Sequence, residues 1–220
     1  MDFLDTLLRF FQNGGSFMYP IAIVLVIGLA VVVERWAFLT HAKHSNRNAF
    51  NKILPLLKKQ DYKGIIQMSR SSQAPVNRII GAGIARLQYS QRRDDIELAM
   101  EEGVLEAIPR LEKRTAYLAT LANIATLLGL LGTIIGLIAA FTAVANADPS
   151  EKATLLSQSI SVAMNTTAFG LISAIPLLMF HALLQTKTTE IIDSLEMAGV
   201  KCLNVLTTGR ALKGETRSND

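Results

Sequence analysis

The chain has 220 residues, of which 50% are hydrophobic and 18% are charged, and its mean hydropathy is +0.32. Soluble domains usually carry about a quarter of their residues as charges, so this composition favours a membrane protein and excludes a disordered chain. The single cysteine, Cys202, excludes an internal disulfide framework and a cysteine-rich zinc site.

The first segment, residues 1–16, is expected to form a short periplasmic interfacial helix. A cleaved signal peptide fits less well, because the chain starts with the acidic sequence Met-Asp-Phe-Leu-Asp. A frayed tail is the alternative. The run Asn13-Gly14-Gly15-Ser16 predicts a break before the first span. The apolar face of the helix comprises Phe3, Leu4, Leu7, Leu8 and Phe11.

Three long stretches that lack Asp, Glu, Lys and Arg are predicted to cross a membrane. Crossing the hydrocarbon core takes about 20 helical residues, and the second and third stretches exceed that length. The first has a shorter apolar part, Phe17 to Val33, which Glu34 and Arg35 can complete if their side chains reach the interface. The predicted spans are residues 17–38, 116–146 and 153–186.

The distribution of basic residues predicts the orientation in the membrane. Residues 40–114 hold 14 of the 22 Lys and Arg residues, against 8 acidic residues. The positive-inside rule therefore places residues 39–115 in the cytoplasm, the N-terminus and the turn at 147–152 in the periplasm, and the helix and tail at 187–220 in the cytoplasm. The net positive charge is thus explained by the orientation of the chain in the membrane, and nucleic-acid binding is not expected.

The cytoplasmic segments show apolar residues at three- and four-residue spacing, which predicts helices. The pattern runs through residues 76–87, through residues 96–111, and along 191–206 as a continuation of the third span. Because Pro109 is the only breaker between residue 96 and the second span, we expect that helix to run straight into the span.

No motif for enzymatic chemistry is present. The sequence has no glycine-rich phosphate loop after a strand, no metal-spaced cluster of His or Cys, and no nucleophile beside a base. We therefore expect no enzymatic activity, no cofactor and no bound metal.

Small and polar residues form a stripe on one face of the second span, and a similar stripe runs along the third. One interpretation is close helix packing, since small residues let membrane helices approach. The other is a polar lining for ions. Because the second and third spans contain no charged residue, a titrating carboxylate for such a lining would have to come from another chain. The second-span stripe comprises Ala122, Thr126, Gly129, Thr133, Gly136 and Ala140, and the third-span stripe Ser159, Ala163, Thr166, Thr167, Gly170 and Ala174.

Several motifs together resemble the MotA/TolQ/ExbB proton-channel family. Leu-Glu-Lys-Arg at 111–114, followed by the sequences at 118–125 and 127–136, resembles the second span of that family. Asn-Thr-Thr-Ala-Phe-Gly-Leu-Ile-Ser-Ala-Ile-Pro at 165–176 resembles its third span. The pair Glu34-Arg35 also fits. The large loop between the first two spans matches the TolQ/ExbB branch better than the four-span flagellar stator subunits.

This resemblance implies an all-α membrane protein that forms a homopentameric ring in the bacterial inner membrane. A dimer of an ExbD/TolR-like single-span protein would supply the membrane Asp, and proton flow would do mechanical work on a periplasm-spanning TonB/TolA-like protein, for outer-membrane transport or envelope maintenance. The family's two pathway threonines fall on Thr133 and Thr167. ExbB-type proteins often carry a Glu five residues before the second threonine, and here that position is Val162.

The remaining site predictions divide into two groups, and three other functions stay open. The alternatives are a scaffold that does not conduct, a sodium-driven member of the same family, and a small transporter. The transporter is disfavoured because the second and third spans carry no charge and the sequence shows no inverted repeat and no paired broken helices. The possible pore-lining residues are Thr126, Ala163, Asn165, Thr166 and Gly170, and the expected helix-packing residues are Gly129, Gly132, Gly136 and Pro176.

Overall fold

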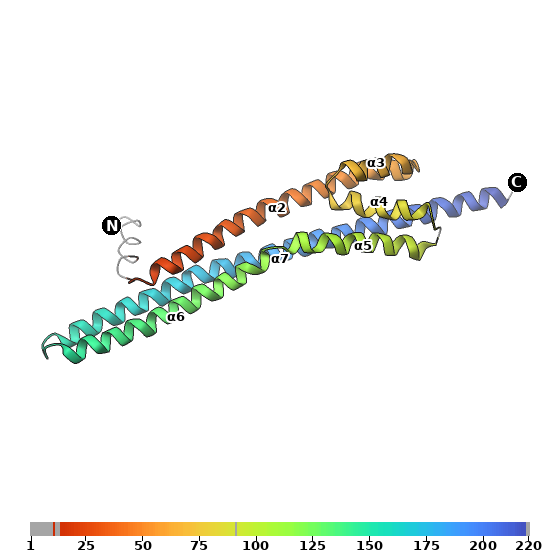
Figure 1. The fold of residues 1–220 in the computed structure, drawn as a ribbon. Helices are drawn as coiled ribbons and strands as arrows, with labels where there is room; N and C mark the ends of the chain where they lie inside the picture. Colours follow the sequence, from red (N-terminus) through yellow and green to blue (C-terminus); the bar gives the residue numbers. More distant parts are fainter. Residues whose placement is uncertain (1–10, 12–13, 91, 219–220) are drawn as a thin grey trace. The chain divides into compact units, whose positions relative to one another are not determined.

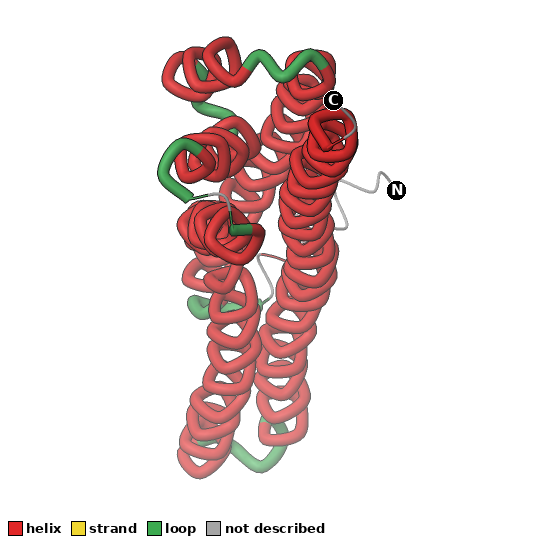
Figure 2. The backbone as a smooth tube through the Cα atoms, turned by 90° about the vertical axis from the view of Figure 1, so that its right-hand side faces the viewer, coloured by secondary structure: helices red, strands yellow, loops and turns green. Residues whose placement is uncertain are grey.

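The computed structural model describes residues 11, 14–90 and 92–218, and it describes side chains as far as residue 207. All the regular structure in this part of the chain is helical, which confirms the predicted all-α class (Figure 2). The N-terminal helix predicted for residues 1–16 lies almost wholly outside the described residues. The helices are α2 (Met18–Lys58), α3 (Tyr62–Ser71), α4 (Pro75–Leu87), α5 (Arg93–Glu112), α6 (Thr115–Asn146) and α7 (Lys152–Ser218).

Three of the described helices are long and apolar enough to cross a membrane, as the sequence predicts. They are α2, α6 and α7. Their outer faces carry large apolar side chains that no other part of the described chain covers: Val26 on α2 is 66% exposed, and Leu127 and Phe141 on α6 are 62% and 64% exposed. Continuous apolar surface of this kind is stable only against lipid or against another protein chain.

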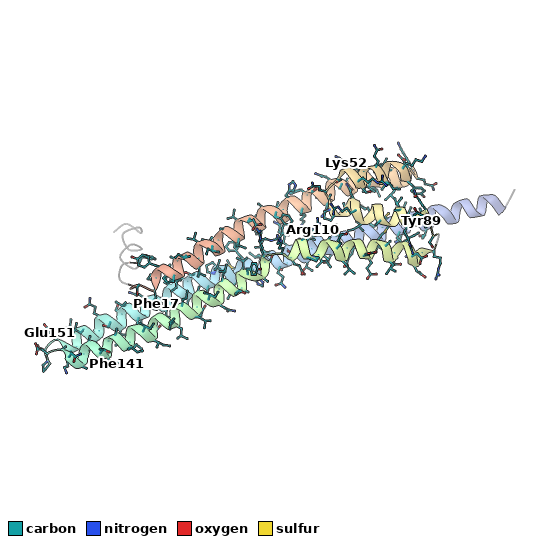
Figure 3. The ribbon with its side chains drawn as sticks, in the orientation of Figure 1. Phe17, Lys52, Tyr89, Arg110, Phe141 and Glu151 are labelled. Carbon is teal, nitrogen blue, oxygen red and sulfur yellow. The ribbon has the colours of Figure 1, made fainter. Side chains whose placement is uncertain are left out.

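The chain divides into two compact units. The first unit comprises residues 1–35 and 114–183, and the second comprises residues 36–113 and 184–220. In the first unit, α6 and the first part of α7 run antiparallel and lie side by side, joined by the turn after Asn146 (Figure 1). Phe141 and Glu151 lie at the turn end of this pair (Figure 3).

The second unit packs α3, α4 and α5 with parts of α2 and α7 around an aliphatic core. The predicted periodicity is confirmed, because Val76, Ile79, Ile80, Ile84 and Leu87 of α4 are buried. The same holds for the inward positions of α5 and α7. These are Ile96, Met100, Val104 and Leu111 on α5, and Ile191, Leu195, Ala198, Cys202 and Leu206 on α7.

A side chain from α2 caps the start of α4 within the second unit. Ala74, the N-cap residue of α4, provides no side-chain hydrogen bond. Asn46 of α2 supplies one instead, because its Oδ1 accepts from the backbone N–H of Val76 at 3.4 Å. This bond satisfies one of the unpaired N–H groups at the helix start and ties α4 to α2.

The prediction that α5 continues without a break into the second span is wrong. The helix ends at Glu112, and the chain breaks at Lys113 and Arg114 before α6 begins at Thr115. Arg114 has φ +68°, in the left-handed region that residues with a side chain rarely adopt. Its guanidinium lies 2.8 Å from the Glu34 carboxylate, a partner 80 positions earlier in the chain. Pro109, the breaker visible in the sequence, lies inside α5.

A polar cluster joins α2 and α7 near the start of the second unit. The ammonium group of Lys187 lies 4.2 Å from the centroid of the Trp36 ring and donates to Thr40 Oγ1 at 2.6 Å. Lys43 pairs with Glu190 at 2.8 Å, and this hydrogen bond lowers the pKa of the Glu190 carboxyl group. Trp36 lies just beyond the apolar part of α2, and tryptophan is enriched at such positions in helices that cross a membrane.

Cys202 is expected to react very slowly with iodoacetamide at pH 8 while the protein is folded. Burial raises the pKa of its thiol to about 12, so the thiolate fraction is about a thousandfold below that of an exposed cysteine. Mass spectrometry of the alkylated protein before and after denaturation measures the difference. As a control, Asp193→Cys in a Cys202→Ala background places an exposed thiol on the same helix, outside the grooves of this unit, and it should react at once. Equal rates for folded and denatured wild-type protein would contradict the burial of Cys202.

Candidate functional site

Glycines bring the backbones of α6 and α7 into direct contact in the first unit. A Cβ atom placed on Gly170 would lie 2.8 Å from the carbonyl oxygen of Ala125 and 3.0 Å from the Cα of Gly129. One placed on Gly136 would lie 2.9 Å from the Cβ of Ala163. At these positions the facing helix occupies the space that a side chain would need, so the two backbones approach closely here.

Two threonine hydroxyls and one carbonyl group meet inside this contact. Thr133 Oγ1 donates to the carbonyl oxygen of Gly129 at 3.1 Å, and Thr167 Oγ1 reaches the same oxygen at 2.9 Å. The two hydroxyls also contact each other. We call these three groups the hydroxyl cluster. Thr133 comes from α6 and Thr167 from α7, so the cluster exists only because the glycine contact brings the helices together.

The hydroxyl cluster has more acceptor capacity than it has protons. Three oxygen atoms contribute lone pairs, whereas only the two hydroxyls carry a hydrogen. Both threonines are half-buried, so one side of the cluster is accessible from outside the subunit. Such a site can accept a hydrogen bond from a water molecule, a hydronium ion or a protonated carboxyl group, or it can contribute oxygen ligands to a small cation. It cannot itself carry a proton, because neither hydroxyl titrates near neutral pH.

The other predicted pore-lining residues differ widely in exposure. Thr126 is exposed and donates to the carbonyl oxygen of Ala122 at 3.1 Å, and Asn165 is half-buried. Ala163 and Gly170 are buried against α6, and Thr166 is only 2% exposed. The pore-lining role of these five residues stays a prediction.

Of the four expected packing residues, three lie in the contact between α6 and the first part of α7. Gly129 and Gly132 are buried, and Gly136 is half-buried against Ala163. Pro176 is half-buried inside α7, and it is not among the residues that lie against the glycines of this contact.

The N-terminal segment takes part in this site in a way that sequence reasoning missed. Thr166 Oγ1 donates to the carbonyl oxygen of Gly14 at 2.6 Å, and Phe17 lies against Gly132. The Phe11 ring packs edge-on against Phe169, with centroids 5.8 Å apart. Figure 3 labels Phe17 where the chain enters α2 beside α7. The sequence signal for this contact is the glycine pair at 14–15, whose pattern predicts a simple break.

Val162 lies under the same segment. Gly15 has φ +74°, and a Cβ atom placed on it would lie 3.1 Å from Val162 Cγ1. The left-handed backbone at Gly15 therefore lets the chain cross close over α7 at the position where ExbB-type proteins often carry a glutamate.

No metal centre is evident in this part of the molecule. Within the described residues, no group of three or more His, Cys, Asp or Glu side chains could hold a metal ion.

Comparison with known proteins places these residues in a family context. The sequence model of the MotA/TolQ/ExbB proton channel family matches residues 71–197. The chain is 28% identical over 202 residues to a putative biopolymer transport protein ExbB homolog of Methanothermobacter thermautotrophicus, covering 90% of this chain and 69% of that protein. It is 28% identical over 216 residues to the Tol-Pal system protein TolQ of Haemophilus influenzae, covering 87% of each chain.

A third relative has a similar level of identity. It is the biopolymer transport protein exbB1 of Vibrio cholerae, 28% identical over 179 residues, covering 79% of this chain and 76% of that protein. The region matched by the family model contains all of α6 and the part of α7 that carries Thr167, and hence the whole hydroxyl cluster.

Proposed function

Because the chain belongs to the MotA/TolQ/ExbB proton channel family, we propose that it is a multi-pass inner-membrane subunit whose hydroxyl cluster forms part of a proton pathway. The observation that carries this proposal is the meeting of Thr133 and Thr167 at the carbonyl oxygen of Gly129. The family's two pathway threonines come from different spans, and in this chain they contact each other directly. We place the N-terminus in the periplasm and the C-terminus in the cytoplasm.

The titrating group in this proposal comes from a partner chain. Spans two and three contain no Asp, Glu, Lys or Arg, so this subunit offers no acid of its own. Relatives are named for biopolymer transport and for the Tol-Pal system, which supports an ExbD/TolR-like single-span partner with a membrane Asp. When protonated, that Asp is neutral and tolerates apolar lining. When ionised, it needs hydrogen-bond donors, and the hydroxyls of Thr133 and Thr167 can rotate to supply them.

Proton flow through this arrangement would be coupled to movement. Each charge that crosses releases about 2.3 kcal/mol per 100 mV of membrane potential. If the Asp alternates between the hydroxyl cluster and the apolar lining, the partner helices turn relative to the ring of subunits. That movement would do work on a TonB/TolA-like protein, in outer-membrane transport or in envelope maintenance.

Two grooves of opposite charge in the second unit support assembly into a ring. One, which we call the acidic groove, has an apolar floor with Glu97, Glu101 and Glu196 around it. The other, the basic groove, has an apolar floor with Lys43, Arg47 and Lys201 around it. Different, complementary faces on one subunit are what a head-to-tail contact between copies requires, and such contacts close into rings. We propose a homo-oligomer of this kind and expect a pentamer.

The absence of a glutamate at position 162 makes sodium the alternative ion. The hydroxyl cluster has the oxygen ligands that a small cation needs. A scaffold that holds a partner helix without conducting is the second alternative, because the same hydroxyls also serve to join α6 to α7 inside one subunit.

Ion flux in liposomes tests the proposal. We expect the subunit, co-reconstituted with its ExbD/TolR-like partner, to acidify or alkalinise the vesicle interior when a potential is imposed in sodium-free buffer, as reported by an enclosed pH-sensitive dye. The subunit alone, or with the partner Asp changed to Asn, should give only the leak of empty vesicles. Flux only in the presence of sodium would identify a sodium-driven member. If an intact complex conducts neither ion, the remaining function is that of a scaffold that holds a partner helix.

A further inference from the structure

A polar groove lies in the second unit, apart from the hydroxyl cluster of the first unit. It has a volume of about 540 Å³ and lies between α2, the end of α3 and the first turn of α4. We call it the polar groove. It is distinct from the acidic and basic grooves and shares no lining residue with them. Its lining residues are His41, His44, Ser45, Asn48, Ala49, Lys52, Met68, Ser71, Ser72 and Asn77.

The lining of the polar groove consists mainly of hydrogen-bond donors. It contains one permanent cation, Lys52, together with two histidines, three serines and two asparagines, and none of the residues that line it is acidic. Lys52, labelled in Figure 3, belongs to the exposed part of α2. Donors gathered around a single cation, with no competing carboxylate, suit an anion.

Ser72 has a hydroxyl hydrogen to spare. Its Oγ accepts a hydrogen bond from the backbone N–H of Ala74 at 3.3 Å, which leaves the O–H free to donate into the groove. Ser72 directly precedes the turn into α4, and the positive end of that helix macrodipole also favours negative charge nearby.

Asn77 provides a second and independent sign of a ligand. It lines the polar groove, it is only 2% exposed, and its Oδ1 has no hydrogen-bond partner among the described residues. A buried polar atom without a partner is costly, so Asn77 Oδ1 is expected to accept a hydrogen bond from a water molecule or a ligand in the groove. An acceptor oxygen in this position needs a donor such as a hydroxyl group.

We propose that the polar groove binds a phosphate-bearing ligand that also carries a free hydroxyl group, of the glycerophosphate type. Lys52 and the Ser72 hydroxyl bind the phosphate, and the ligand hydroxyl donates to Asn77 Oδ1. This chemistry has two sources, a soluble sugar or polyol phosphate and the headgroup of a phospholipid such as phosphatidylglycerol. His41, at one end of the groove, follows Trp36 by five residues on α2, about 7.5 Å along the helix, whereas Lys52 follows Trp36 by 16 residues, about 24 Å. The soluble source is therefore favoured, and the lipid headgroup is the alternative outcome of the test.

Two measurements on the full chain test this proposal and distinguish the sources. The first is calorimetric titration of sn-glycerol 3-phosphate into the protein held in phosphatidylcholine nanodiscs. The second is native mass spectrometry of the protein after exchange between phosphatidylglycerol and phosphatidylcholine. The test variant is Lys52→Ala with Ser72→Ala, which changes only residues on the groove rim. The control is Lys63→Ala, which removes an exposed lysine of α3 outside the groove.

Saturable binding of glycerol 3-phosphate that weakens about tenfold or more in the double variant, and less than about twofold in the control, supports a soluble ligand. Selective retention of phosphatidylglycerol that the double variant loses supports a lipid headgroup. The proposal is overturned if neither probe binds, or if Lys63→Ala weakens binding as much as the double variant does. The ion-flux test does not depend on this result, because the polar groove lies outside the unit that holds the hydroxyl cluster.

Discussion

Replacing Thr133 and Thr167 together with valine is expected to stop ion flux while the complex still assembles. Valine keeps the branched shape at both positions and removes both hydroxyls, so the apolar contact between α6 and α7 remains. The carbonyl oxygen of Gly129 keeps its helical N–H partner. A hydrogen bond to a charged group contributes about 1.5–3 kcal/mol, so losing two should slow transit about a hundredfold or more. The measurements are dye-reported flux in liposomes and the mass of the purified complex.

Two controls separate this effect from general damage to the spans. Serine at both positions keeps the hydroxyls and should keep most of the flux. Thr142→Val removes an exposed hydroxyl on the same helix that bonds only to the carbonyl oxygen of Ile138, at 2.9 Å, and should leave the flux unchanged. Full flux in the double valine variant would exclude Thr133 and Thr167 from the pathway, whatever else the subunit does.

Gly170→Ala is expected to destabilise the first unit. The new Cβ would lie 2.8 Å from the Ala125 carbonyl oxygen and 3.0 Å from the Gly129 Cα, and both are backbone atoms. They cannot turn aside as a side chain can, so α6 and α7 must move apart. Overpacking of this kind costs about 1–3 kcal/mol. We expect a lower thermal unfolding temperature in detergent and a loss of flux, because the separation also pulls Thr167 away from Thr133.

Gly199→Ala is the matched control for that substitution. It makes the same change in the same helix, but the added Cβ would meet only side-chain atoms, Met100 Cβ at 3.9 Å and Ile79 Cγ2 at 4.0 Å. These are ordinary contacts, so the unfolding temperature should stay the same or rise, since alanine lowers the entropy of the unfolded chain by about 0.4–1 kcal/mol. If both variants lose stability equally, the close contact at Gly170 is not the cause.

Sequence patterns predict those structural features that depend only on the residues of a single segment. The charge-free stretches identify the three helices that are long and apolar enough to cross a membrane, because a charge is costly in hydrocarbon wherever it occurs along the segment. The three- and four-residue spacing around Ile79 and Ile96 identifies buried faces, because an α-helix repeats every 3.6 residues. The family motifs likewise lie within single spans, at 127–136 and 165–176.

Only the tertiary structure shows which residues of different spans contact each other. Thr133 and Thr167 are 34 positions apart, and both stripes contain more than one hydroxyl, yet among the described residues only this pair shares the Gly129 carbonyl. The link from Thr166 to Gly14 spans 152 positions. Arg114, at the break between α5 and α6, pairs with Glu34, 80 positions earlier in the chain. Periodicity assigns a residue to a helix face, but the register between two helices is set by close backbone approach, here at Gly129 and Gly170, which depends on both helices at once.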